Sequence, residues 1–317
     1  MSLKIENIIK SVLIVSMTCC VQPSELLGQG CSDAGFCTMG AMRPDQGYSK
    51  KLSIRLRSIE FSHYLGKTRF KDLVFNYTTD FNFGLNDRTT IQVKIPYVYV
   101  QGVLKDTNGI GDLSLSATRN IVANEKYQVN FTLGTKLPTG NSNFDLDGKP
   151  LPMYYQAGLG TYDIIAGISV ISRGWLLAAG YQQALNRSNN DFWWTDWENH
   201  VDEHSSVKYR QSRSLNRGKD IMFRVEKNFR FSNFNFNVGL LPIYRINKDD
   251  IISRKGEKLT IPHTDGLALS LLVGGGYQFS VKSGIKIMNG FRLERRPHNP
   301  DGLSREFVSN VGYVYRF

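Results

Sequence analysis

The segment 191–219 gathers side chains that could bind a metal ion. His200 and His204 lie four positions apart, with Asp202 and Glu203 between them. Two histidines at this spacing bind zinc from one face of a helix when a glutamate directly follows the first histidine and acts as the general base. A valine stands at that position here. The segment therefore lacks the zinc signature, and we predict neither a metal nor another cofactor.

The same segment holds a serine that could act as a nucleophile. The sequence HSS at 204–206 precedes SRSLNR at 212–217, and a histidine and an asparagine close to a serine can activate its hydroxyl. This stretch resembles the catalytic segment of outer-membrane phospholipase A, a twelve-stranded barrel in which His-x-Ser precedes Ser-Arg-Ser-Trp-Asn-Arg. The spacing is two residues shorter here, and VK at 207–208 replaces the family's Asn-Gly. A phospholipase-like hydrolase with Ser206 as nucleophile is one alternative.

The first thirty residues have the pattern of a secretory signal peptide. The basic residues Lys4 and Lys10 come first, an apolar stretch of about ten residues follows, and the small residues Gly28 and Gly30 come last. The apolar stretch is far shorter than the roughly 20 residues that a membrane-spanning helix needs. We therefore predict a signal peptide over 1–30. A buried N-terminal helix is the alternative.

Removal of the signal peptide would leave Cys31 and Cys37 as the only thiols. Two close cysteines in an exported chain predict one small disulfide loop in an oxidising compartment. A lipid anchor on Cys31 is the alternative, but Gly28 stands where such anchors normally have leucine. We expect residues 31–50 to form a disulfide-closed segment that either lies in the periplasm or plugs the domain that follows.

The charge of the chain is strongly basic, with a formal net charge of +11 over 317 residues. Such an excess indicates nucleic acid or anionic lipid as a partner. The export signal argues against nucleic acid. After residue 30 no window contains 18 apolar residues in a row, so we predict no transmembrane helix.

From about Leu52 onward, apolar and polar residues alternate with a period of two, which is typical of β-strands. In VFNYTTDFNFGL the aromatic residues occupy one face and the polar residues the other. Strands of roughly twelve residues are about twice as long as those of soluble sheets, and about 9 to 11 tilted residues cross a bilayer. The pattern predicts twelve strands at 52–64, 74–85, 89–100, 111–120, 127–136, 160–170, 175–185, 219–229, 234–247, 266–279, 285–295 and 305–317.

The first of these strands departs from the alternation. Its apolar set is Leu52, Ile54 and Leu56, and it then changes phase to Ile59 and Phe61. A one-residue bulge near position 58 would restore the phase, because a bulge places two residues opposite one on the neighbouring strand.

The connections between the strands alternate in length. The tight ones lie at 86–88, 124–126, 172–174, 232–233 and 281–284, and the long ones at 104–110, 138–158, 188–217, 248–264 and 298–304. Short turns on one side and long loops on the other predict an all-β fold, a transmembrane antiparallel up-and-down β-barrel of about twelve strands over 51–317. Outer-membrane lipid would surround it. The terminal Phe317 would be the insertion signal read by the barrel-insertion machinery, with both chain ends periplasmic.

A family resemblance lies between residues 109 and 182. The sequence GIGD at 109–112 opens one strand, LPTG at 137–140 closes the next, and GLG at 158–160 precedes a third. Together they resemble the outer-membrane barrel family named for the meta-pathway of phenol degradation, a group of transporters. The resemblance covers about a quarter of the chain and implies a transport function without specifying the solute. Loop and strand-end geometry also explains such glycines and prolines.

The function is predicted from the interior of the barrel. Charges at mid-strand are costly on a lipid-facing surface, so they should face inward. The interior set is Asp80, Lys94, Asp112, Lys136, Arg224, Glu226, Arg245, Lys286, Arg292 and Glu294. More of these residues are basic than acidic, which predicts a channel or transporter for small polar or anionic solutes that favours anions over cations. The family resemblance adds aromatic solutes, although a charged interior suits aromatic hydrocarbons poorly. The alternative is a closed barrel that docks a partner at the cell surface. Trp193, Trp194 and Trp197 are expected to be interface anchors on an outer loop.

Overall fold

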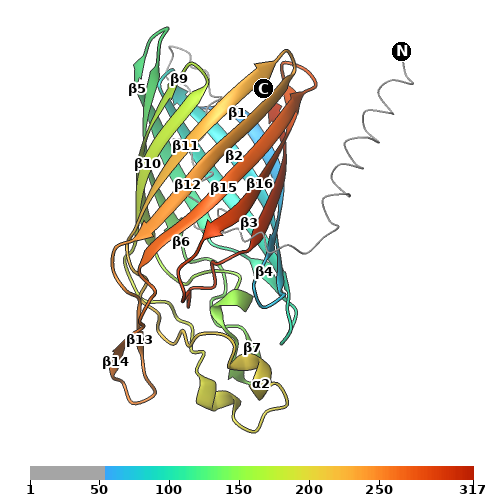
Figure 1. Cartoon of the computed structure of the whole chain (residues 1–317). Coiled ribbons are helices and arrows are strands. Elements are labelled where there is room, and N and C mark those ends of the chain that lie inside the picture. The colour runs from blue at the N-terminus through green and yellow to red at the C-terminus, as the bar shows by residue number, and fades with distance from the viewer. Residues whose placement is uncertain (1–53) are drawn as a thin grey trace, which may run out of the picture.

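Alternation of polar and apolar residues produces long strands throughout residues 54–317, which are the residues that this computed structural model describes. Twelve strands pair side by side and close into an antiparallel barrel (Figure 1). Their bounds are β1 Arg55–Lys67, β2 Leu73–Asn86, β3 Thr89–Gln101, β5 Leu113–Ala123, β6 Gln128–Leu137, β9 Asp163–Ser172, β10 Trp175–Ala184, β11 Asp220–Phe231, β12 Phe234–Arg245, β15 Gly266–Gln278, β16 Ser283–Glu294 and β17 Phe307–Arg316.

The barrel closes where its first and last strands meet. β1 pairs with β17 from Ser58 opposite Arg316 to Lys67 opposite Phe307. Every other pairing in the barrel joins strands that are consecutive in the barrel order along the chain. The topology is therefore up-and-down, and the predicted fold class is confirmed.

The two ends of the barrel differ in their connections, as predicted. The tight turns and the C-terminus lie at one end, which we call the turn end (Figure 1). The longer connections lie at the opposite, loop end. They carry the short elements β4 Thr107–Ile110, β7 Asp145–Leu146, β8 Lys149–Pro150, η3 Met153–Tyr155, η4 Trp194–Trp197, α2 Glu203–Ser206, β13 Asp250–Ile252 and β14 Lys258–Thr260.

The predicted bulge in the first strand is confirmed. The register between β1 and β2 shifts between Leu56 and Ser58, so that Arg57 is the additional residue. From Ser58 onward the alternation runs without interruption, and Glu60 falls on the interior face opposite Asp80. The bulge therefore decides which residues of β1 face inward.

The outer surface of the barrel is apolar and its interior is mainly polar. Exposed apolar residues on the outer surface include Phe61, Tyr77, Leu133, Leu177 and Phe223. Buried polar residues at the alternating positions include Thr78, Asn82, Gln92, Ser116 and Thr132. No helix within residues 54–317 is long and apolar enough to span a membrane.

Two parts of the interior wall are apolar, which the sequence pattern did not predict. Ile165, Leu176, Ala178 and Met222 form a buried cluster on β9, β10 and β11. A second apolar area lies on β2 and β3 near the loop end, where the loops pack against it.

The predicted signal peptide (1–30) and the predicted segment 31–50 with its Cys31–Cys37 disulfide lie outside the described residues.

Candidate functional site: the interior wall and its loop-end cap

The predicted interior charges lie largely in pairs along the wall. Lys94 and Asp80 occupy directly opposite positions on β3 and β2, with Nζ 3.8 Å from Oδ1. The Nζ of Lys136 lies 3.6 Å from Oδ2 of Asp112. Because both members of each pair are largely buried, each charge is compensated locally.

Five of the six remaining predicted interior residues are buried or half-buried and fall into three groups. Arg224 and Glu226 are buried on β11 and form an ion pair. Arg245 and Arg292 are buried at the loop-end termini of β12 and β16. Lys286 is half-buried opposite Gly276.

Glu294 is a correction to the predicted set. It is exposed at the end of β16. The register between β15 and β16 shifts between Leu269 and Ser270, so Glu294 stands opposite Leu269 while Arg292 stands opposite the buried Ser270. This irregularity interrupts the alternation and removes Glu294 from the interior face.

Further acidic residues in the interior change the predicted charge balance. Glu60, Asp163 and Asp220 are buried at interior positions of β1, β9 and β11. Glu60 was missed because of the phase change in the first strand, and the two aspartates were missed because they begin their strands. With these three added and Glu294 removed, the strand interior has no basic excess.

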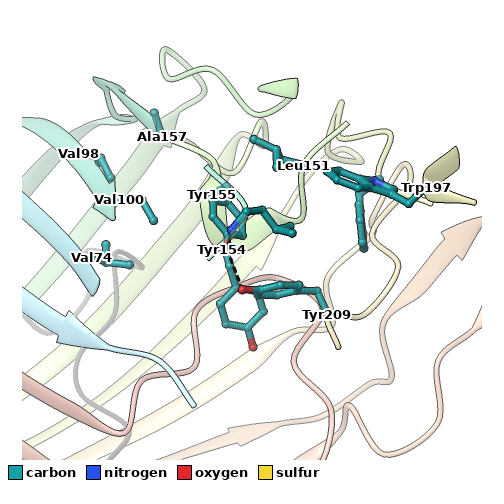
Figure 2. Close-up of a cluster of buried hydrophobic side chains, with 11 residues drawn as sticks. Val74, Val98, Val100, Leu151, Tyr154, Tyr155, Ala157, Trp197 and Tyr209 are labelled. Atoms are coloured by element: carbon teal, nitrogen blue, oxygen red, sulfur yellow. Dashed lines mark hydrogen bonds between the residues drawn. The ribbon is translucent and has the colours of Figure 1, made fainter. Parts of the chain in front are cut away.

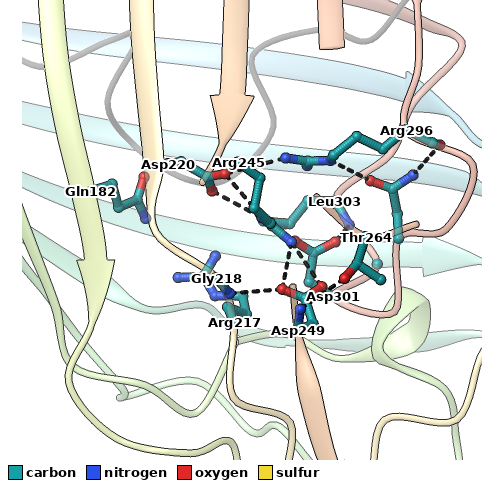
Figure 3. Close-up of polar contacts among 12 residues, drawn as sticks. Gln182, Arg217, Gly218, Asp220, Arg245, Asp249, Thr264, Arg296, Asp301 and Leu303 are labelled. Atoms are coloured by element: carbon teal, nitrogen blue, oxygen red, sulfur yellow. Dashed lines mark hydrogen bonds and ion pairs between the residues drawn. The ribbon is translucent and has the colours of Figure 1, made fainter. Parts of the chain in front are cut away.

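The densest ion cluster surrounds Arg245 (Figure 3). Its Nε and Nη2 donate to Oδ1 and Oδ2 of Asp220, each at 2.9 Å. The Nη1 donates to Oδ2 of Asp249 at 2.9 Å, and Nη2 also donates to Oδ2 of Asp301 at 2.9 Å. Arg296 donates to Asp220 at 3.2 Å. The cluster thereby ties the ends of β11 and β12 to the last two loops.

Burial and charge act differently on the two loop carboxylates of this cluster. Burial alone would raise the pKa of Asp301, but Arg245, Arg296 and Arg217 together outweigh it and lower that pKa to about 2. The pKa of Asp249 is raised, and burial is the main cause. Arg245 lowers this pKa, but the negative charge of Asp301 raises it further. The fold therefore favours the ionised form of Asp301 and disfavours that of Asp249.

We expect Asp301→Asn to lower the free energy of unfolding at pH 7 by about 2 kcal/mol and Asp249→Asn to lower it less. Because folding lowers the pKa of Asp301, its contribution is present above about pH 4 and is lost as the pH falls toward 2. Urea unfolding followed by tryptophan fluorescence measures both variants. The Asp301→Asn variant should also show a flatter stability curve between pH 4 and pH 2, and equal losses in the two variants would contradict this assignment.

The residues that carry the family resemblance meet at one point of the loop end. Asp112 Oδ1 accepts from the Gly140 N–H at 3.1 Å, and its Oδ2 accepts from the Leu159 N–H at 2.7 Å. The Thr139 hydroxyl donates to the Gly111 carbonyl at 2.9 Å. A Cβ at Gly158 would lie 2.2 Å from Asp112 Oδ1, so only glycine fits there. The motif therefore joins the ends of β5 and β6 to the base of the loop before β9.

Loops fold against the interior wall at the loop end and form what we call the cap (Figure 2). Val74, Val98 and Val100 provide the wall. The cap residues packed on that wall and on one another are Leu104, Leu151, Tyr154, Tyr155, Ala157, Phe192, Trp197 and Tyr209. The short helix η3 also reaches the last loop, where the Tyr154 hydroxyl donates to the Asn299 carbonyl at 3.2 Å. The cap therefore extends across the loop end.

A single buried carboxylate holds the cap together. Asp72, which is 0% exposed, accepts from the hydroxyls of Tyr155 and Tyr209 at 2.8 and 2.9 Å. It also accepts from the Thr68 hydroxyl at 3.0 Å and from the Val103 N–H at 3.1 Å. Asp72 lies in the connection 68–72, which the sequence pattern did not single out. Its side chain thus joins four segments of the loop end.

The tyrosine hydroxyls of the cap keep their protons. Burial raises the pKa of Tyr155 and of Tyr209, and the nearby Asp72 charge raises both further. Burial raises the pKa of Tyr154 to about 12. These hydroxyls therefore remain hydrogen-bond donors at physiological pH.

No protein-family model and no curated protein matches the chain. Among solved structures, it is similar to the COG4313 outer membrane channel from Pseudomonas putida F1, with a TM-score of 0.58 at 16% sequence identity over 87% of this chain and 99% of that chain. The fold is that of an outer-membrane β-barrel. The NanC porin gives a TM-score of 0.45 at 9% identity over 84% of this chain and 100% of that chain. The KdgM porin gives 0.42 at 10% identity over 82% and 99%.

A second correction concerns the three loop tryptophans of this outer-membrane barrel. Trp197 is fully buried within the cap, and its Nε1 donates to the Pro150 carbonyl at 3.1 Å. Trp194 packs partly buried against the cap and donates to the Tyr209 carbonyl at 2.8 Å, while Trp193 packs on a neighbouring buried cluster. Trp197 is therefore a buried part of the cap, not an exposed interface anchor, and Trp193 and Trp194 pack partly on the loops.

The residues of the hydrolase alternative point to other partners. The buried Ser206 hydroxyl donates to the Glu203 carbonyl at 2.9 Å, and the Asn216 amide donates to Asp250 at 2.9 Å. His204 is exposed. Within residues 54–317, no group of three or more His, Cys, Asp or Glu side chains could hold a metal ion.

Proposed function

We propose that this protein is an outer-membrane channel for small polar, anionic or aromatic solutes. The observation that carries the proposal is a closed barrel whose outer surface is apolar and whose interior wall carries buried polar and charged side chains. Such an interior solvates polar solutes better than it solvates hydrocarbons. The resemblance to the transporters of the meta-pathway family supports the same function. The loop end would face the outside of the cell and the turn end the periplasm.

A closed barrel that docks a partner at the cell surface is the second candidate. The cap favours it, because the apolar and aromatic residues of the cap pack across the loop end and restrict passage. For a channel, the cap would instead be a gate that opens at intervals. The two candidates therefore differ in whether the protein conducts at all.

We expect the purified full-length protein to produce discrete conductance steps in planar bilayers. Because acidic and basic residues balance on the strand interior, we expect at most a weak preference for anions over cations. Reversal potentials in a potassium chloride gradient report this preference. The chain lacking 31–50, measured alongside, tests the predicted plug, and a higher conductance on deletion would support it. Absence of conductance and of liposome uptake in both proteins would reject the channel and favour docking.

A further inference from the structure

Within residues 54–317, five arginines carry buried N–H groups without a hydrogen-bond acceptor. Two of them, Arg213 and Arg217, form ion pairs with Asp191 and Asp163, and the other three lie on or beside β16, β17 and β1. Arg292 on β16 is 2% exposed, and Arg305, shortly before β17, is 3% exposed. The Nε and Nη1 of Arg292 and the Nε of Arg305 make no hydrogen bond, nor does the Nε of Arg69, which follows β1. Leaving a buried charged donor unsatisfied is costly. These groups therefore need an acceptor that the described chain does not provide.

The three arginines lie on or beside neighbouring strands of one wall. Arg292 stands opposite the buried Ser270 and faces the interior. Arg305 lies over Gly66 of β1, where an added Cβ would be 2.9 Å from Arg305 Cδ. Glu306 links β16 to β1, because its Oε1 accepts from Arg292 Nη2 at 3.3 Å and its N–H donates to the carbonyl of Lys67.

The charge at this place is not balanced, in contrast to the Arg245 cluster. Arg292 has one carboxylate partner, Glu306. Arg305 donates to the carbonyls of Gly302 and Ser304, which carry no net charge. Within residues 54–317, neither Arg305 nor Arg69 forms an ion pair. Of the three guanidinium groups, only that of Arg292 has a carboxylate partner within residues 54–317.

We propose that Arg292, Arg305 and Arg69 form a subsite that binds the carboxylate of a small soluble organic acid in the interior of the barrel. The inference rests on the proposed channel function, which brings the solute to the site. A guanidinium presents paired N–H donors that match the two oxygens of a carboxylate. A singly charged group suits the site better than a phosphate dianion, because Glu306 next to Arg292 repels additional negative charge.

Calorimetric titration of the detergent-solubilised full-length protein tests the subsite with gluconate, glucose and inorganic phosphate. Gluconate and glucose are of similar size and differ in charge. We expect gluconate to bind, glucose not to bind, and phosphate to bind more weakly than gluconate. Arg292→Gln and Arg305→Gln should each weaken gluconate binding by about tenfold, as expected for loss of a charged hydrogen bond. Arg295→Gln removes the same charge from an exposed side chain of the same loop and should change the affinity less than twofold.

Several results would overturn the subsite. These are no gluconate binding to the wild type, phosphate binding as tight as gluconate binding, or equal weakening by Arg295→Gln. If Arg292→Gln does not fold, Arg292→Lys keeps the charge without the paired donors and should still weaken gluconate binding. Gluconate uptake into liposomes separates the two proposals: uptake without any effect of the arginine variants rejects the subsite alone, whereas arginine-dependent binding without uptake rejects the channel alone.

Discussion

Asp72→Ala is expected to open the cap and to raise the time-averaged conductance of the channel at least tenfold. The substitution leaves the Thr68 hydroxyl and the Val103 N–H without their acceptor, and it leaves the Tyr155 and Tyr209 hydroxyls, which lie 2.7 Å apart, with one acceptor fewer than they have donors. Each unsatisfied buried donor costs about 1–3 kcal/mol. A total of several kcal/mol shifts a closed-to-open equilibrium by more than a hundredfold, because about 1.4 kcal/mol corresponds to a factor of ten.

Planar-bilayer recording measures the Asp72→Ala effect, and protease cleavage within the loop 138–162 reports opening independently of conduction. Asp106→Ala is the matched control. Asp106 also accepts from a tyrosine hydroxyl and a backbone N–H, those of Tyr99 and Gly102, but these contacts are exposed. Unchanged conductance and unchanged cleavage in the Asp72 variant would show that this carboxylate does not hold the cap. Increased cleavage without conductance would instead support the docking function.

Arg245→Met is expected to lower the free energy of unfolding by about 4 kcal/mol. The substitution leaves the buried carboxylates of Asp220, Asp249 and Asp301 without their main cation. Breaking a buried ion pair by removing one partner typically costs about 3–5 kcal/mol, because the remaining charge stays buried and uncompensated. The loss should appear as a lower urea midpoint and a lower yield of folded barrel.

Two further variants make the Arg245 prediction specific. Arg254→Met removes the partner of Asp196 in an exposed pair and should cost less than about 1 kcal/mol. The double variant Arg245→Met with Asp301→Asn should be more stable than Arg245→Met alone, because one uncompensated charge is removed. Equal destabilisation by Arg245→Met and Arg254→Met would contradict the role assigned to the cluster.

The strands could be predicted from the sequence because lipid and interior impose opposite polarity on alternate residues. Even the bulge at Arg57 was visible, since it shifts the phase of the apolar set. Glu294 was misassigned because the corresponding irregularity on β15 and β16 falls at a strand end, where too few residues remain to reveal a phase change. Inward-facing charges were identified by period, but their partners depend on the register between strands.

The cap could not be predicted, because its residues follow no period. Asp72 is one aspartate in a short connection, and its partners Tyr155 and Tyr209 lie 83 and 137 residues away along the chain. Trp197 was misassigned because the interface rule assumes that aromatic residues near a membrane surface are exposed. In this chain the loop that carries it packs on the other loops of the cap and buries Trp197 instead.

The seam between β1 and β17 has a consequence for assembly. All other barrel pairings join strands that follow one another, whereas the seam joins Ser58 to Arg316, at opposite ends of the barrel sequence. The entropy cost of closing a loop grows with its length, so hairpins form more readily than the seam. We therefore expect β1 and β17 to pair last. Until then the growing sheet presents two unpaired edges, which would template aggregation in water. We therefore propose that the insertion machinery shields β1 and β17 until they meet.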